Sequence, residues 1–325
     1  MVVGAFIAKI PVVSRATFHN SRIDASTGEA GPMMAQPSAL WRPGSRVTLS
    51  PRQGSSAGGM SSDQTDRKSL VRQQFDTIAA DYDRGPGCFG HFGRRLAAVA
   101  DVEPGQRVLD VACGRGAVLF PAAERVGPAG EVVGIDLAEE MARATNEEAA
   151  RRGFAARVRV MDAEHLEFPD AAFDRVLCGF GVMFFPDQDR ALGEFARALK
   201  PRGRLAVSTW HVTQAHELDT AMAALGFNLP RPPGWITEPD DLSQLLTRAG
   251  FADLRITVDW QSFRYSDVEE YWQQARGTGM RRALDALDAT QAERLRAALA
   301  ERMRPYRRPD GFHVPAAALL AVAGR

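Results

Sequence analysis

The stretch that decides the fold is Val108-Leu-Asp-Val-Ala-Cys-Gly-Arg-Gly-Ala117. A short apolar run ends at an acid, Asp110, and turns through a glycine-rich loop into a helical pattern. Gly114 and Gly116 tolerate positive φ and let a ligand approach the backbone closely. Free N–H groups at the start of the following helix attract an anion. The stretch therefore predicts a strand, a ligand-binding loop and a helix, with a carboxylate or phosphate of the ligand at the turn.

A dinucleotide-binding loop uses the same device, and two residues argue against that alternative. The third glycine of a G-x-G-x-x-G motif would fall at position 119, which is Leu119. Asp110 stands at the end of the strand, where a nicotinamide-binding strand is usually apolar. A nicotinamide cofactor is therefore disfavoured.

Strand-like and helical segments alternate around this loop. Helices are expected at 66–82, 117–126, 138–152 and 190–199, and strands at 107–111, 131–135, 156–160, 173–178 and 204–209. Such alternation predicts an α/β fold with a parallel sheet and helices on both faces. A helix at 238–249 follows, with Thr237 as its N-cap and Gly250 as its C′ residue. The remaining expected segments are a strand at 254–265, helices through 303 and a last apolar run at 316–322.

Two more acids stand at the ends of successive expected strands. Asp136 ends Val132-Val-Gly-Ile-Asp136, and a carboxylate there can accept both hydroxyls of a ribose; the alternative is a carboxylate that only stabilises a helix start. Asp162 follows the third strand, where it can accept from an exocyclic amine. With Asp110, these acids point to the carboxyl edge of the sheet, where ligands bind in open α/β folds.

Composition excludes several classes of protein. The chain has 325 residues, 45% of them hydrophobic, with 40 basic and 40 acidic side chains. No apolar run reaches the ~18 residues of a membrane-spanning helix, and zero net charge argues against a nucleic-acid-binding protein. The three cysteines (Cys88, Cys113 and Cys178) form neither a disulfide framework nor a metal site, which favours a reducing cytoplasm. Arginine far outnumbers lysine among the basic residues, which is typical of a GC-rich bacterial genome.

Residues 1–59 differ from the rest of the chain. They hold six basic and two acidic residues and are rich in Gly, Pro and Ser, and 31–59 show no periodic pattern, which predicts disorder. A transit peptide is one interpretation. The favoured one is an upstream translation start, with Met60 as the first residue of the working protein. Residues 60–325 then carry the function, with a net charge of −4.

Three further motifs complete a family pattern. They are Phe75-Asp-Thr-Ile-Ala-Ala-Asp-Tyr-Asp83, Asp162-Ala-Glu-His-Leu-Glu-Phe-Pro-Asp-Ala-Ala-Phe-Asp174 and Glu194-Phe-Ala-Arg-Ala-Leu-Lys-Pro-Arg-Gly203. Together with the loop after Asp110, they make residues 70–325 resemble the class I S-adenosylmethionine-dependent methyltransferases, in the small-molecule branch that includes the ubiquinone/menaquinone biosynthesis C-methyltransferases. The resemblance implies a Rossmann-like seven-stranded sheet with six parallel strands, the last strand being antiparallel and paired in a hairpin. It also implies a cofactor-binding core at about 95–210, and a cap with the end of the sheet at 211–325, in which 211–237 cover the substrate pocket.

The resemblance also implies a cofactor site for S-adenosylmethionine. Its expected residues are Tyr82, Asp110, Ala112, Gly114, Gly116, Asp136, Leu137, Met141, Asp162, Ala163, Cys178 and Gly179. Tyr82, Cys178 and Gly179 are expected near the sulfonium. Three residues depart from the family pattern: Ala112 replaces a loop glycine, Ala138 replaces a capping serine, and Arg202 replaces the second glycine of a Lys-Pro-Gly-Gly turn.

Aromatic and apolar side chains are expected on the substrate side of the cofactor. The set is Phe89, Phe92, Phe180, Met183, Phe184 and Trp210, and the alternative for each is a place in the core. Such a pocket suits a lipophilic or polyketide-like acceptor. His211 and His91 are the candidate bases, each alternatively a surface or pocket histidine, and Glu164 is a possible contact of adenine or substrate.

The sequence therefore predicts a cytoplasmic bacterial methyltransferase of specialised metabolism. It would act on carbon or oxygen of a small, apolar acceptor, without nucleic acid or a membrane span, as a possible homodimer. One alternative is a quinone-biosynthesis C-methyltransferase. Another is a protein that binds the cofactor without methylating, as a cyclase would.

Overall fold

The computed structural model describes residues 40–41, 62–83, 85–227 and 231–325. The expectations of a disordered leader and of a start at Met60 therefore concern residues outside this range, apart from β1 (Leu40–Trp41). This two-residue strand pairs antiparallel with Ile256 and Thr257.

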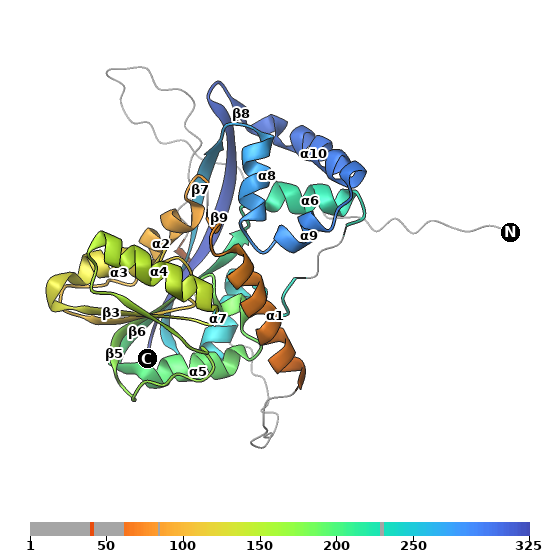
Figure 1. Cartoon of the computed structure of the whole chain (residues 1–325). Coiled ribbons are helices and arrows are strands. Elements are labelled where there is room, and N and C mark those ends of the chain that lie inside the picture. The colour runs from red at the N-terminus through yellow and green to blue at the C-terminus, as the bar shows by residue number, and fades with distance from the viewer. Residues whose placement is uncertain (1–39, 42–61, 84, 228–230) are drawn as a thin grey trace, which may run out of the picture. The chain divides into compact units, whose positions relative to one another are not determined.

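A single mixed sheet organises the chain (Figure 1). Its first five long strands run parallel: β2 (Arg107–Val111), β3 (Glu131–Asp136), β4 (Arg157–Val160), β5 (Phe173–Gly179) and β6 (Leu199–Val212). The sheet continues with β9 (Gly311–Gly324), which is antiparallel to both β6 and β7 (Ala252–Tyr265). The order is β4-β3-β2-β5-β6-β9-β7, with β1 beside β7 and β8 (Arg307–Arg308) beside β9. The expected seven strands, six in one direction and the last reversed, are confirmed.

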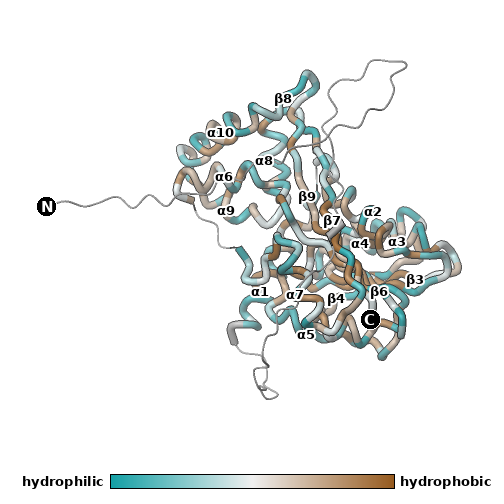
Figure 2. Tube along the Cα trace, turned by 180° about the vertical axis from the view of Figure 1, so that it is seen from behind, coloured by the Kyte–Doolittle hydropathy of each residue, from teal (hydrophilic) through white to brown (hydrophobic). Residues whose placement is uncertain are grey.

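Helices cover both faces of this sheet, as the sequence predicted. One face packs against α2 (Cys88–Val99), α3 (Leu119–Val126) and α4 (Glu139–Arg152), and the other against α5 (Gln188–Ala198) and α7 (Pro239–Arg248). A hydrophobic core lies on each face of the sheet. Successive side chains of a strand point to opposite faces, so Val108 packs in one core and Leu109 in the other. Figure 2 shows the resulting apolar band along the strands, with hydrophilic stretches on the outer helices.

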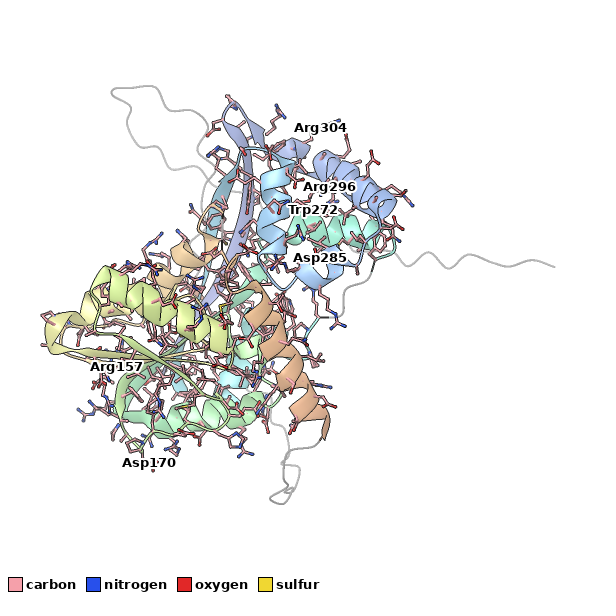
Figure 3. All side chains as sticks on the ribbon, in the orientation of Figure 1. Arg157, Asp170, Trp272, Asp285, Arg296 and Arg304 are labelled. Atoms are coloured by element: carbon pink, nitrogen blue, oxygen red, sulfur yellow. The ribbon has the colours of Figure 1, made fainter. Side chains whose placement is uncertain are left out.

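The ends of β7 and β9 carry a helical cap instead of a hairpin turn. The two strands pair from Ala252–Gly324 to Tyr265–Phe312, but the chain between them forms α8 (Val268–Arg276), α9 (Arg281–Asp285) and α10 (Ala289–Met303). The antiparallel pairing of these two strands and the helices expected between them, through 303, are confirmed. The cap also includes α6 (His216–Ala224). Figure 3 shows Arg296 beside Trp272 here, with the guanidinium 4.2 Å from the ring centre.

Local chemistry explains where elements begin and end. Helix α7 is capped by Glu238 rather than by Thr237, because Pro239 has its φ fixed for the first helical position. Gly250 has a φ of +89°, as the expected C′ residue. The short helices are η1 (Gly127–Ala129), η2 (Val182–Phe184) and η3 (Arg304–Tyr306). Among the described residues, no helix has the length and apolar character that crossing a bilayer requires.

Candidate functional site

Two cavities lie where β2, β3 and β5 end. The larger, of about 740 Å³ including space open to solvent, is bounded by these strand ends, by residues 184–186 and by α1 (Ser62–Ile78). The smaller, of about 380 Å³, lies around the loop after β2 and includes Asp110, Arg115 and Ser208 in its wall. Tyr82, Ala112, Gly114, Gly179 and Phe180 contribute to both. The sheet edge predicted from the three acids is thus where the hollows are.

Asp110 is a buried carboxylate without a hydrogen-bond partner among the described residues. Its side chain is fully buried, and neither oxygen accepts a hydrogen bond from the described residues. Burial raises the pKa of Asp110 well above its ordinary value, and the charge of Asp136 adds to this, against the lowering effect of the Leu119 N–H. A buried acceptor with nothing to accept from is costly, so the position calls for a ligand that donates.

The loop after β2 leaves room for a ligand at one glycine and not at the other. Gly114 has a φ of +50°, and a Cβ there would meet only the Tyr82 ring at 3.9 Å. Gly116 has a φ of +80°, and a Cβ there would lie 2.5 Å from the Phe120 ring. Gly116 is therefore required for packing, whereas Gly114 offers open backbone to the cavity. Ala112 adopts a φ of +53°, a conformation that favours the glycine it replaces.

Asp136 holds the loop and the start of α4 together. Its two carboxylate oxygens accept hydrogen bonds from the backbone N–H groups of Gly114 (2.8 Å) and Ala138 (2.9 Å). Burial raises the pKa of Asp136 to about 6, against the lowering effect of these N–H groups and with a further rise from Asp76. The bond that a capping serine would make to the first turn of α4 comes instead from the Asp76 carboxylate, which accepts from the Glu140 N–H. The Asp136 carboxylate keeps lone pairs for further donors and lies in the wall of the larger cavity.

Asp162 is paired with a lysine from α1. Lys68 Nζ lies 2.6 Å from Asp162 Oδ2 and 2.5 Å from Glu164 Oε2, and all three residues contribute to the larger cavity. Burial alone would raise the pKa of Asp162, but Lys68 and the Glu164 N–H hold it below its ordinary value. Glu164 is 2% exposed and also accepts from the Asp187 N–H at 2.8 Å. Glu164, expected as a possible contact of adenine or substrate, thus forms a cluster with Lys68 and Asp162.

Helix α1 is fixed to the site at further points. The Asp76 carboxylate accepts from the Glu140 N–H at 2.9 Å, at the start of α4. Arg115 Nη1 donates to the Ala79 carbonyl at 2.6 Å, just beyond the end of α1. The cover over the larger cavity therefore comes from α1 and the chain that follows it. Of the expected cover, the described residues 211–227 and 231–237 contribute to neither cavity wall.

The expected substrate residues form an aromatic cluster. Phe180 stacks on Trp210 with ring centres 4.2 Å apart, and Phe89 contacts both rings edge-on. Phe92 and Met183 are buried in the same core. Phe89, Phe180 and Phe184 reach a cavity wall, whereas Phe92, Met183 and Trp210 pack behind it.

The two candidate bases lie away from these walls. His211 Nδ1 lies 2.8 Å from the Thr237 carbonyl and donates to it, so the neutral form of the ring has its lone pair on Nε2. His91 lies 3.7 Å from Asp259. Burial lowers the pKa of His91, against the opposing effect of Asp259.

Of the expected cofactor residues, all but Gly116 and Cys178 contribute to a cavity wall. Cys178 is buried, with Sγ near Gly181. The sequence analysis missed Lys68, which no motif or spacing links to the acids, and Arg115, which lies within the glycine loop but was given no role. Unpartnered Asp110, the open backbone at Gly114 and the free lone pairs of Asp136 fit a ligand that combines an ammonium with ribose hydroxyls. S-adenosylmethionine has both.

Comparison with known proteins places the chain among methyltransferases. A family model described as a methyltransferase domain matches residues 108–203. Nocamycin O-methyltransferase of Saccharothrix syringae is 48% identical over 136 residues, which cover 41% of this chain and 49% of that protein. The chain thus spans about half the length of that relative. Aklanonic acid methyltransferase DauC of Streptomyces sp. (strain C5) is 38% identical over 207 residues, covering 58% of this chain and 94% of that protein.

A quinone-pathway relative and a solved structure are also similar. Ubiquinone/menaquinone biosynthesis C-methyltransferase UbiE of Teredinibacter turnerae is 31% identical over 207 residues, covering 61% of this chain and 82% of that protein. The crystal structure of the [4+2]-cyclase SpnF superposes with a TM-score of 0.51 at 21% identity, covering 79% of this chain and 96% of that chain. The structural likeness shows the fold.

Proposed function

Because the chain belongs to the S-adenosylmethionine-dependent methyltransferases, we propose that it methylates an acidic oxygen of a small, mainly apolar acceptor. The observation that carries the proposal is the make-up of the cavity walls. They combine carboxylates suited to the cofactor with aromatic side chains, and none of the described residues that form them is a histidine. We propose specialised metabolism in the cytoplasm of a bacterium as the setting. The three cysteines are free and buried, which agrees with a reducing compartment.

The carboxylates divide the cofactor site into parts. Asp136 would accept from the ribose hydroxyls, and Asp162 with Ala163 would face the adenine edge, while Leu137 and Met141 pack against its ring. Asp110 and the open backbone at Gly114 would receive the amino-acid end. S-adenosylmethionine supplies a sulfonium methyl that is already activated for transfer. The protein's work is to hold an acceptor atom in line with that methyl.

An acidic acceptor oxygen fits cavity walls to which no histidine among the described residues contributes. A carboxylic acid is ionised at neutral pH, and its oxygen is a nucleophile without further proton transfer. The names of the two relatives, an O-methyltransferase and an aklanonic acid methyltransferase, support oxygen over carbon. For a less acidic acceptor, His211 Nε2 and His91 are the proposed proton acceptors, with Phe89, Phe180 and Phe184 as the apolar wall.

Carbon methylation in quinone biosynthesis is the second candidate, supported by the likeness to UbiE. Incubation with methyl-labelled cofactor separates the two. The acceptors are a host extract and a set of lipophilic carboxylic acids, each paired with its alcohol. Label in an alkali-labile ester of low mass is the expected result. Label in an alkali-stable C-methyl product supports the quinone candidate, and no transfer with cofactor bound supports a protein that does not methylate.

A matched pair of variants tests the aromatic cluster. Trp210→Phe should raise the KM for the acceptor severalfold and leave the cofactor Kd unchanged, because Trp210 supports the wall through Phe180. Trp272→Phe, in the cap beside Arg296, should change neither. An unchanged KM in Trp210→Phe would remove this residue from the acceptor site.

A further inference from the structure

Arg115 is a second charged group in the smaller cavity that forms no ion pair with the described residues. Its side chain forms part of the same wall as Asp110. Nε is buried and has no hydrogen-bond partner among the described residues. Within that part of the chain, no carboxylate lies within ion-pairing distance of the guanidinium, whose Nη1 donates to the Ala79 carbonyl.

A neutral carbonyl does not compensate the charge of this half-buried guanidinium. The group has five N–H donors in a planar fork whose geometry matches a carboxylate. Leaving a buried charge unpaired is costly. Arg115 therefore offers its remaining donors to an anion, and the cavity wall is where such an anion has access.

We propose that Arg115 binds the carboxylate at the amino-acid end of the cofactor. Asp110, on the same wall, then meets the ammonium of that end, so the cavity is complementary to a zwitterion. The inference rests on the cofactor orientation proposed above. Arg115 would then select cofactors whose amino-acid end carries a free carboxylate. A carboxylate on the acceptor has the same chemistry, and the experiment separates the two sources.

Three ligands isolate the carboxylate in calorimetric titrations of the full chain. S-adenosylhomocysteine has both charges, its decarboxylated analogue keeps the ammonium alone, and 5′-methylthioadenosine has neither. Charge-assisted hydrogen bonds contribute roughly tenfold to hundredfold in affinity. The wild-type protein should prefer S-adenosylhomocysteine over the decarboxylated analogue by that factor. Arg115→Met should reduce the preference to near one and leave binding of the other two ligands unchanged.

Arg281→Met is the matched control. Arg281 also holds this end of α1, through the Thr77 carbonyl (3.2 Å) and Asp81 (2.8 Å), but does not contribute to either cavity wall. The Arg281→Met variant should keep the wild-type preference for S-adenosylhomocysteine over the decarboxylated analogue. Arg115→Lys, which retains the charge without the fork, should recover part of it.

Three results overturn the proposal. Equal weakening of all three ligands by Arg115→Met would make Arg115 a tether for α1. An unchanged preference with a raised KM for the acceptor would assign it to the acceptor's carboxylate. If the wild-type protein bound S-adenosylhomocysteine and its decarboxylated analogue equally well, a contact between Arg115 and the cofactor carboxylate would be excluded, even if Arg115→Met did not fold. Failure of the wild-type protein to bind 5′-methylthioadenosine would instead contradict the proposed cofactor orientation.

Discussion

Cofactor affinity should fall below pH 6 because of Asp136. Two positions on its carboxylate are occupied by the N–H groups of Gly114 and Ala138. A proton added to the group must therefore sit on the side that faces the cavity, where the ribose hydroxyls would donate. Binding thus requires the ionised form, whose pKa burial raises to about 6.

The size of the effect follows from that pKa. At pH 5, one unit below it, about one tenth of the protein has Asp136 ionised, so the apparent Kd should rise about tenfold, or about 1.4 kcal/mol. Near pH 8 Asp136 is ionised in almost every molecule, so the cofactor affinity should no longer change with pH. Asp110 also has a raised pKa and would act in the same direction through the ammonium. Asp162, whose pKa is lowered, should stay ionised throughout.

Titration calorimetry between pH 5 and 8 measures this profile. 5′-Methylthioadenosine is the ligand of choice, because it lacks the ammonium and so removes the contribution of Asp110. Asp76→Asn provides the control, since the charge of Asp76 raises the pKa of Asp136 and an asparagine oxygen can still accept from the Glu140 N–H. This variant should shift the midpoint to lower pH. A Kd that is constant from pH 5 to 8, or a midpoint unmoved in Asp76→Asn, would refute the reasoning.

Three predictions concern stability and are measured by urea unfolding. Because Asp136 has a higher pKa in the folded than in the unfolded chain, the free energy of unfolding should fall by up to about 3 kcal/mol as pH rises from about 4 through 6, and Asp136→Asn should lack this slope. Lys68→Met should lower the free energy of unfolding by about 2–4 kcal/mol, because it leaves Glu164 buried without its cation. Adding Glu164→Gln to this variant should recover part of the loss, and a double variant whose loss equals the sum of the two single losses would contradict the pairing. Arg202→Gly should stabilise by about 0.5–1 kcal/mol, since Arg202 is held at a φ of +65°, and a loss of stability would show that its side chain contributes.

Sequence patterns located the site to the extent that its determinants are local. The apolar run, Asp110 and the glycine loop are contiguous, so the strand and its loop could be predicted together. Asp136 and Asp162 follow from strand ends, which alternation places at one sheet edge. The helices between β7 and β9 were predicted as well, but the place of β9 between β6 and β7 was not, because a strand pattern carries no information about which neighbours it pairs with.

Contacts between distant parts of the chain could not be read in this way. Lys68 is 94 positions from Asp162, and its pairing depends on how α1 crosses the strand ends. On the sequence, Lys68 resembles any exposed lysine of a polar helix. The conformation of Ala112 is similar: a substituted glycine is visible in the sequence, but a φ of +53° at that residue is not.

Helix α1 belongs to the cofactor site as much as to the cover above it. Lys68 binds the acids after β4, Asp76 accepts from the start of α4, and the Ala79 carbonyl receives the Arg115 guanidinium. Each of these partners is next to, or is, a residue proposed to touch the cofactor. A shift of α1 must therefore change the charge around Asp162 and the orientation of Arg115 together. Substitutions in α1 should alter cofactor affinity even where the changed side chain never meets the ligand.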